Sequence, residues 1–166
     1  MRSARGFTLV ELLVVVGILG IMSAALIATL DPFAQFQKGS DAKRKSDLSQ
    51  VQKALESYYQ DTGKYPINNP ANDYRIYDDR VGQKNIIDWG ASWAPYMSVL
   101  RKDSKTTNNY VYVDASDGQS YYLYASLDKG GKDPQACFSS GAKCTNAPAA
   151  CGGVCNYGVT SPNTSP

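Results

Sequence analysis

The sequence predicts an α+β protein with a helical N-terminal part, a β-hairpin and a C-terminal region stapled by disulfides. Three observations predict this class. An apolar run fills residues 7–30, and an amphipathic pattern of helical period follows it over residues 31–62. Two tyrosine-rich runs around an Asp/Gly turn occupy residues 110–127, and all four cysteines follow them. A chain of 166 residues has room for about one globular domain.

The apolar run Phe7–Leu30 is long enough to cross a membrane, because a helix of this length rises about 36 Å against a hydrocarbon core of about 30 Å. Three interpretations compete: a secretory signal cut near Ser23–Ala25, an uncleaved anchor, or a permanent helix released by cleavage after Gly6. Glu11 weakens the first, since a carboxylate in hydrocarbon costs about 2.5 kcal/mol or more near the bilayer centre. A role in crossing the membrane therefore does not by itself explain Glu11.

The net charge of the chain is small, at +2. Without Arg2 and Arg5 the basic and acidic residues balance at 15 each, so the charge gives no reason to expect a polyanionic partner. Basic residues are denser after the apolar run, at Lys38 and at 43–45, and the positive-inside rule alone would leave the C-terminal part in the cytoplasm. We give precedence to the clustered cysteines, which indicate an oxidising exterior.

The four cysteines have the spacing C-x6-C-x6-C-x3-C, and they are Cys137, Cys144, Cys151 and Cys155. An even number gathered at one end of a chain with an export-like N-terminus favours disulfides. The alternative is a four-thiolate zinc site, which usually shows paired C-x2–4-C spacings, and only Cys151 and Cys155 approach that pattern. Four cysteines allow three connectivities, and their spacing does not choose among them.

A second helix is predicted by an apolar stripe at helical spacing. The stripe consists of Leu48, Val51, Leu55 and Tyr58. Asp31 followed by Pro32 predicts either the N-cap and first turn of this helix or a kink in one long helix. The helix should end at Thr62–Gly63, because Gly63 suits a left-handed cap and Pro66 prevents continuation.

The basic cluster Lys43-Arg44-Lys45 has two interpretations. It could bind nucleic acid or lipid head groups, or it could be a solvated helix face. We expect the solvated face, because acidic residues on the same helix offset the charge, and nucleic-acid binding has no further support. These acidic residues are Asp41, Asp47 and Glu56.

Between the second helix and the hairpin, residues 67–109 are rich in Asn, Asp, Pro and Gly. They predict a long irregular connection with one short helical turn near Trp93–Leu100. The hairpin should place alternate residues of its second strand on one face, namely Tyr121, Leu123, Ala125 and Leu127. The remainder, residues 128–166, is expected to be loop-like.

Catalytic chemistry is not indicated. The sequence contains no histidine, which excludes His-based triads and most catalytic zinc sites. Asp78 and Asp79 could form a carboxylate pair, but adjacent acids in a polar loop are usually just solvated. Asp114 and Asp117 could ligate calcium through the hairpin turn, but we expect a plain hairpin turn instead. We therefore expect a protein that is not an enzyme.

The segment Arg5–Glu11, RGFTLVE, with the apolar run behind it, resembles the class III leader and mature N-terminus of type IV pilins and type II secretion pseudopilins. The likeness continues through DLSQVQKALESYYQDTGKYP, which is similar to the end of the long first helix in major pseudopilins and related pilins. It covers Arg5–Pro66 well and the hairpin loosely. The cysteine-bearing tail is more similar to a pilin C-terminal loop.

The resemblance implies that a prepilin peptidase cuts between Gly6 and Phe7 and that Phe7 is N-methylated. Glu11 would then face the new amino group on Phe7 of a neighbouring subunit, where an opposite charge meets the buried carboxylate. The implied type IV pilin fold is a long helix, hydrophobic in its first half, whose second half lies against a small antiparallel sheet. No cofactor is expected. Calcium occupies a C-terminal loop of major pseudopilins, but those ligands match no positions in this tail.

On this resemblance we expect a pilin that polymerises into an extracellular filament. Its partners would be further copies of itself, the prepilin peptidase, and the pilus or secretion machinery in the inner membrane. The chain would span the cytoplasmic membrane once before assembly. The expected segments are a leader (1–6), a hydrophobic filament-core helix (7–30), an amphipathic helix half (31–62) and a globular head (63–166) with a loop (63–109), the hairpin (110–127) and the cysteine region (128–166).

Two alternatives remain open from the sequence. Within the same class, the chain could be a pseudopilin of a type II secretion system, and the stapled tail favours the pilus. From another class, it could be an extracytoplasmic binding protein held in the membrane by an uncleaved anchor.

Overall fold

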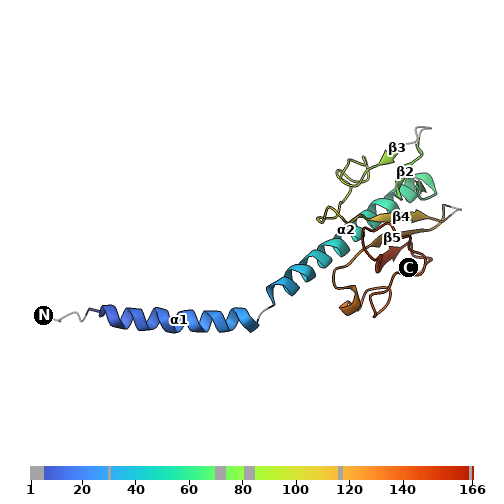
Figure 1. The fold of residues 1–166 in the computed structure, drawn as a ribbon. Helices are drawn as coiled ribbons and strands as arrows, with labels where there is room; N and C mark the ends of the chain where they lie inside the picture. Colours follow the sequence, from blue (N-terminus) through green and yellow to red (C-terminus); the bar gives the residue numbers. More distant parts are fainter. Residues whose placement is uncertain (1–5, 30, 70–73, 81–84, 116–117, 165) are drawn as a thin grey trace. The chain divides into compact units, whose positions relative to one another are not determined.

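The computed structural model describes residues 6–29, 31–69, 74–80, 85–115, 118–164 and 166. The chain divides into two compact units, Met1–Phe36 and Gln37–Pro166. The first contains helix α1 (Leu9–Thr29), and helix α2 (Pro32–Thr62) begins in the first unit and continues into the second (Figure 1). We call the second unit the head.

Helix α2 begins and ends at residues that the sequence marks. The backbone N–H of Ala34 donates to Oδ1 of Asp31 at 3.0 Å, so Asp31 is an N-cap in front of Pro32 and a separate helix starts there. At the other end Gly63 has φ of 73°, and its N–H donates to the Tyr59 carbonyl at 2.8 Å. This left-handed C-terminal cap is confirmed as predicted.

The strands of the described residues form two antiparallel three-stranded sheets. The first has the order β1-β2-β3 and comprises β1 (Ile67–Asn69), β2 (Arg75–Asp78) and β3 (Asn85–Ile87). The second has the order β4-β5-β6 and comprises β4 (Val111–Asp114), β5 (Tyr121–Ala125) and β6 (Tyr157–Thr160). The predicted hairpin is β4–β5, with Asp114 opposite Tyr121 in the register.

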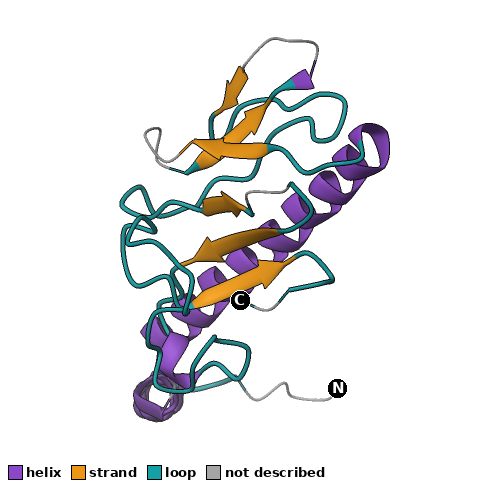
Figure 2. Ribbon diagram, turned by 90° about the vertical axis from the view of Figure 1, so that its right-hand side faces the viewer, coloured by secondary structure: helices purple, strands orange, loops and turns teal. Residues whose placement is uncertain are grey.

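The core of the head lies where α2 crosses the strands (Figure 2). Leu48, Val51, Leu55 and Tyr58 of the predicted stripe are all fully buried. The face of β5 that was predicted from alternation packs into this core, while Tyr124, on the other face, packs against the cysteine region. The β4-β5-β6 sheet is therefore covered on both sides, by α2 and by the disulfide-bonded tail.

Two predictions for residues 63–109 are wrong. This segment is not an irregular loop, because β1, β2 and β3 lie within it. The helical turn expected near Trp93 is absent from these described residues: Trp93 and Met97 form a β-bridge with reciprocal backbone hydrogen bonds of 2.9 Å. Strands of three or four residues are too short to show alternation, and polar residues of the strands obscure it further.

The C-terminal region is more ordered than predicted. It contains β6, which pairs with β5, and the 3-10 helix η3 (Gly130–Lys132). The cysteines form disulfides Cys137–Cys144 and Cys151–Cys155, with Cα–Cα distances of 5.2 and 5.5 Å. Both bridges join cysteines that are neighbours along the chain, so each closes one short loop beside the sheet.

Candidate assembly site

The N-terminal segment presents an apolar surface that its own chain does not cover. Every side chain described from Phe7 to Ile27 is exposed, with Phe7 exposed by 83%. The stretch Leu9–Ile27 is long and apolar enough to cross a membrane, and none of it is buried. Leaving so large an apolar area in water is unfavourable, so this helix requires lipid or other helices around it.

Glu11 lies in the first turn of α1 and forms a capping box with Thr8. Oε2 of Glu11 accepts hydrogen bonds from the backbone N–H and the hydroxyl of Thr8, both at 2.9 Å. In return the N–H of Glu11 donates to Oγ1 of Thr8 at 3.2 Å. This reciprocal pairing of a Thr at the N-cap with a Glu three residues later satisfies donors that a helix start otherwise leaves unpaired.

The capping box gives Glu11 a local role and fixes where its charge lies. The carboxylate is held beside the first turn of α1, at the end of the helix that carries Gly6 and Phe7. Among the described residues no cation pairs with this carboxylate, so its charge is available to a positive group from outside the segment. Oε2 is engaged by Thr8, which favours approach at the other oxygen.

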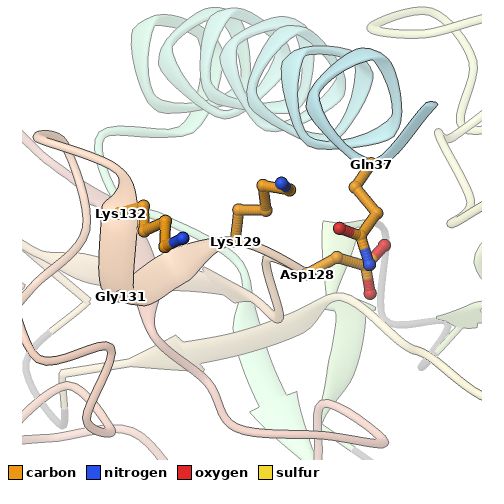
Figure 3. Close-up of a pocket in the computed structure, with 5 residues that line it drawn as sticks. All are labelled: Gln37, Asp128, Lys129, Gly131 and Lys132. Atoms are coloured by element: carbon orange, nitrogen blue, oxygen red, sulfur yellow. The ribbon is translucent and has the colours of Figure 1, made fainter. Parts of the chain in front are cut away.

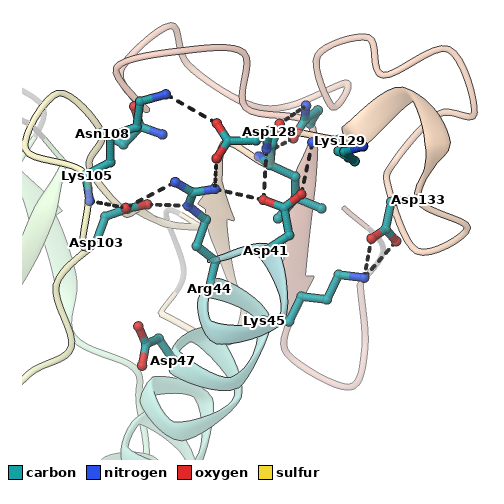
Figure 4. Close-up of polar contacts among 12 residues, drawn as sticks. Asp41, Arg44, Lys45, Asp47, Asp103, Lys105, Asn108, Asp128, Lys129 and Asp133 are labelled. Atoms are coloured by element: carbon teal, nitrogen blue, oxygen red, sulfur yellow. Dashed lines mark hydrogen bonds and ion pairs between the residues drawn. The ribbon is translucent and has the colours of Figure 1, made fainter. Parts of the chain in front are cut away.

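In the head, the basic cluster does not form the solvated face that the sequence predicts. Arg44 is only 2% exposed and contacts three carboxylates (Figure 4). Its guanidinium donates to Asp41 at 2.7 Å, to Asp103 at 2.7 Å and to Asp128 at 2.9 Å. Lys45 pairs with Asp133 at 2.6 Å. Two of the three basic residues therefore fasten α2 to the loops that follow it.

These contacts shift the pKa values of Arg44 and Asp128. Burial favours the neutral form of Arg44, but the hydrogen bonds and charges of Asp103 and Asp128 outweigh it and raise the pKa of the guanidinium. Burial also works against the charge of Asp128, yet Arg44 holds the pKa of Asp128 below its usual value. We call Arg44, Asp41, Asp103 and Asp128 the Arg44 network.

Asp78 and Asp79 are not the solvated loop acids that the sequence predicts. Asp78 is buried at 6% exposure, and its Oδ2 accepts from Arg80 at 2.6 Å and from the Trp93 indole at 2.9 Å. Asp79 pairs with Lys64 at 2.6 Å. Burial raises the pKa of Asp78, but hydrogen bonds from Arg80 and Trp93 outweigh it and hold this pKa below its ordinary value. The hydrogen bond from Lys64 lowers the pKa of Asp79. Both acids anchor the β1-β2-β3 sheet.

The calcium prediction at the hairpin turn rests on Asp114 and Asp117, and Asp117 lies outside the described residues. Asp114 accepts the N–H of Asn68 at 2.9 Å and donates its own N–H to the Asn68 side chain at 3.0 Å. It thus joins β1 to β4. Across the part of the chain that the structure describes, no group of three His, Cys, Asp or Glu side chains is placed to hold a metal ion.

Comparison with known proteins gives this N-terminal segment a family. A family model, the prokaryotic N-terminal methylation motif, matches residues 1–27. The chain is 36% identical over 118 residues to the type II secretion system core protein G of Vibrio cholerae, a match that covers 70% of this chain and 75% of that protein. The chain belongs to the type IV pilin and type II secretion pseudopilin family.

Other members of this pilin family are also similar. The type IV wide pilus major component PilA4 of Thermus thermophilus is 29% identical over 130 residues, covering 78% of this chain and 87% of that protein. The core protein G of Klebsiella pneumoniae is 36% identical over 66 residues, which is 40% of this chain and 46% of that protein. No solved structure matches this pilin-like chain.

Sequence reasoning missed two features of the site. The first is the capping role of Thr8, although Thr-x-x-Glu before an apolar run is a sequence signature of a helix start. The burial of Arg44 had no local signal, because two of its three carboxylate partners lie 59 and 84 residues away along the chain. Only the tertiary fold brings them together.

Proposed function

We propose that this chain is the structural subunit of a type IV pilus-like extracellular filament. A prepilin peptidase cleaves the precursor between Gly6 and Phe7, and Phe7 is then N-methylated. The mature chain is anchored once in the cytoplasmic membrane until it is taken up into the filament by the assembly machinery there. Its role is structural rather than catalytic.

The observation that carries this proposal is the uncovered apolar surface of α1. The segment from Phe7 to Ile27 exposes every described side chain, and the methylation motif matches the same part of the chain. A membrane covers such a surface with lipid, and a filament core covers it with helices of other subunits. A pilin uses both environments in turn, which explains why α1 is apolar around its whole circumference.

For Glu11 we propose a role in subunit register. A carboxylate among packed apolar helices requires a cationic partner, and breaking a buried pair of this kind typically costs about 3–5 kcal/mol. The proposed partner is the α-amino group of Phe7 in a neighbouring subunit, a charge that exists only after cleavage. The capping box supports this, because it holds the carboxylate at the end of α1 that carries Phe7.

The remaining segments follow from these roles. We assign residues 1–6 to the leader and residues 7–30 to the filament core. Residues 31–62 form the amphipathic half of the helix, and residues 63–166 make the outer surface of the filament. The disulfides suit this surface, because each closes a short loop of the tail and such bridges persist in an oxidising exterior.

The experiment is to determine the intact mass and N-terminal residue of the protein from its native host, together with electron microscopy of the sheared cell-surface fraction. A chain that starts at methylated Phe7 and is found in filaments is the expected result. A chain that starts near Leu26 would show that the apolar run is a secretory signal. An intact Met1 on membrane-bound monomers, in a host with active prepilin peptidase, would favour an anchored binding protein.

A second candidate function is that of a pseudopilin of a type II secretion system, which the likeness to core protein G of Vibrio cholerae supports. Deleting the gene separates the two. Loss of surface filaments with normal protein secretion supports the pilus, whereas accumulation of secreted enzymes in the periplasm supports the pseudopilin.

A further inference from the structure

A pocket of about 380 Å³ lies in the head between the first residues of its part of α2 and the segment around η3. It is lined by Gln37, Asp128, Lys129, Gly131 and Lys132 (Figure 3). Figure 3 shows the side chains of Lys129 and Lys132 extending from the η3 segment and Gln37 extending from α2. The pocket is wholly within the head and its lining carries two ammonium groups.

The acidic groups near this pocket are already paired with other cations. Asp128 contacts Arg44 at 2.9 Å and Lys105 at 3.3 Å, and Asp133 contacts Lys45 at 2.6 Å. Neither Lys129 nor Lys132 has an ion-pair partner among the residues that the structure describes. Arg44 and Lys105 offset two of the three carboxylates Asp41, Asp103 and Asp128, so the two pocket lysines still leave a net positive charge in this region.

The backbone of the pocket is held in place before any ligand arrives. Both oxygens of the buried Asp41 carboxylate accept main-chain hydrogen bonds, from Asp128 at 2.8 Å and from Lys129 at 2.9 Å. The side chain of Asn156 pairs with the N–H and the carbonyl of Leu127, at 2.8 and 3.1 Å. A fixed backbone lowers the entropic cost of binding, so the pocket is suited to a ligand rather than to solvent alone.

We propose that this pocket binds the phosphate group of an anionic membrane lipid, through Lys129 and Lys132, while the subunit is still in the membrane. The proposal rests on the membrane anchoring in the proposed function. A phosphodiester carries one negative charge shared by two oxygens, so each ammonium group can donate to one of them, and the Gln37 amide can donate a further hydrogen bond.

Chain connectivity favours a lipid over other anions. Gln37 lies ten residues after Ile27, the end of the stretch able to span a membrane. Ten residues reach about 15 Å when helical and at most about 36 Å when extended, whatever the orientation of the two units. Phe33 and Phe36, exposed by 69% and 75%, lie in this connection and suit the interface of a bilayer. Electrostatic attraction between basic residues and anionic lipid adds to the binding of such apolar residues at the interface.

The test counts lipids bound to the full chain in neutral detergent by native mass spectrometry, with phosphatidylglycerol and phosphatidylcholine as probes. The variant Lys129→Gln/Lys132→Gln removes the pocket charge. The matched control is Lys38→Gln/Lys43→Gln, which removes the same charge from two exposed lysines of α2 outside the pocket. We expect the wild type to retain phosphatidylglycerol selectively, the pocket variant to bind it roughly tenfold or more weakly, and the control to change by less than about twofold.

Three results would overturn the proposal. Equal losses in both variants would mean diffuse attraction to basic residues, and equal retention of phosphatidylcholine would mean that the lipid binds through its chains. Full displacement of the lipid by millimolar inorganic phosphate would assign the pocket to free phosphate. The proposed function is tested separately, because a chain that is processed and anchored but retains no phosphatidylglycerol refutes only the lipid site.

Discussion

Helix α1 and the head both contain many apolar residues, but α1 exposes them and the head buries them. The described side chains from Phe7 to Ile27 are exposed, and the start of α1 carries the local hydrogen bonds of the capping box. The head turns its apolar residues inwards and provides hydrogen-bond acceptors for several of its buried tyrosine hydroxyls. Tyr110 donates to Asp47 at 2.9 Å, and Tyr112 donates to the Pro66 carbonyl at 2.6 Å.

The difference teaches where each part obtains its stability. The head is stabilised by its own core, its ion pairs and its disulfides, so it should respond to changes in those contacts wherever the chain is. Helix α1 is stabilised by what surrounds it, because its apolar area is buried only by lipid or by neighbouring helices. Substitutions in α1 should therefore alter assembly, and substitutions in the head should alter folding.

The largest effect is expected from Glu11→Gln. Glutamine can still complete the capping box, so α1 should form and insert normally, but the charge is lost. We expect filaments to fall by about a hundredfold or more, because the amino group on Phe7 of the neighbouring subunit would be buried unpaired. Negative-stain electron microscopy measures the filaments, and mass spectrometry checks the processing.

The control for this prediction is Thr8→Ala, which removes the capping hydroxyl and keeps the carboxylate. It should cost the start of the helix about 1 kcal/mol and leave filaments in place. If Thr8→Ala abolishes filaments and Glu11→Gln does not, the capping box rather than the charge explains Glu11.

The next largest effect is expected from Arg44→Met in the head. This change leaves three buried or half-buried carboxylates without their common cation, and we expect it to lower the free energy of unfolding of the head by about 3–5 kcal/mol. Urea unfolding of the full chain in neutral detergent, followed by tryptophan fluorescence, measures it, because Trp89 and Trp93 both lie in the head.

A matched change is Arg101→Met, which removes an exposed arginine whose contact is with the Gln50 side chain. It should shift the unfolding free energy by less than about 0.5 kcal/mol. Equal unfolding curves for Arg44→Met and Arg101→Met would show that the Arg44 network does not stabilise the head.

The disulfides should contribute less than the network. Each closes a short loop, with sequence separations of 7 for Cys137–Cys144 and 4 for Cys151–Cys155. Loop-closure entropy then predicts about 2 kcal/mol for each bridge. Replacing either pair by alanine should lower the urea midpoint of the head but leave insertion of α1 unchanged. A reducing agent should lower the midpoint of the wild type and have no effect on a variant lacking all four cysteines.

The smallest effect is expected from a change of pH, which alters the stability of the head through its ion-paired carboxylates. The pKa values of Asp78, Asp128 and Asp133 are held below their ordinary value, against burial, by hydrogen bonds and charges from Arg80, Arg44 and Lys45 respectively. A carboxyl with a lowered pKa stabilises the folded state above its unfolded pKa of about 4, and this contribution is lost as the pH falls further.

The thermal midpoint of the head, followed by near-ultraviolet circular dichroism, should therefore be flat from pH 7 to about pH 5 and fall below pH 4. The variant Asp78→Asn should be less stable at neutral pH and show a shallower fall. A midpoint that rises on acidification would contradict the assignment of these ion pairs.

Prediction from sequence succeeded where a single element carries its own signal. The spacing of Leu48, Val51, Leu55 and Tyr58, and the caps at Asp31 and Gly63, each depend on residues close together in the chain. The leader motif and the apolar run are equally local, and they led to the correct family.

Prediction from sequence failed where residues that contact one another are distant in the chain. Strand β6 has four residues and pairs with β5, which lies more than thirty residues earlier, so it reads as part of a loop. Arg44 looks like any basic residue on a solvated helix face until Asp103 and Asp128 are brought to it. Asp78 likewise accepts the indole N–H of Trp93, which lies 15 residues further along the chain.

The position of β6 has a consequence for the order in which the head is completed. Strand β5 lies between β4 and β6, and β6 is the last strand of the described chain. A chain emerging N-terminus first from synthesis or export can form α2 and the β4–β5 hairpin early, but one edge of β5 stays open until Thr160 has emerged. An open strand edge is a site for aberrant pairing with other chains. Chains that stop before Tyr157 should therefore aggregate or be degraded, so that subunits with incomplete heads are removed before they reach a growing filament.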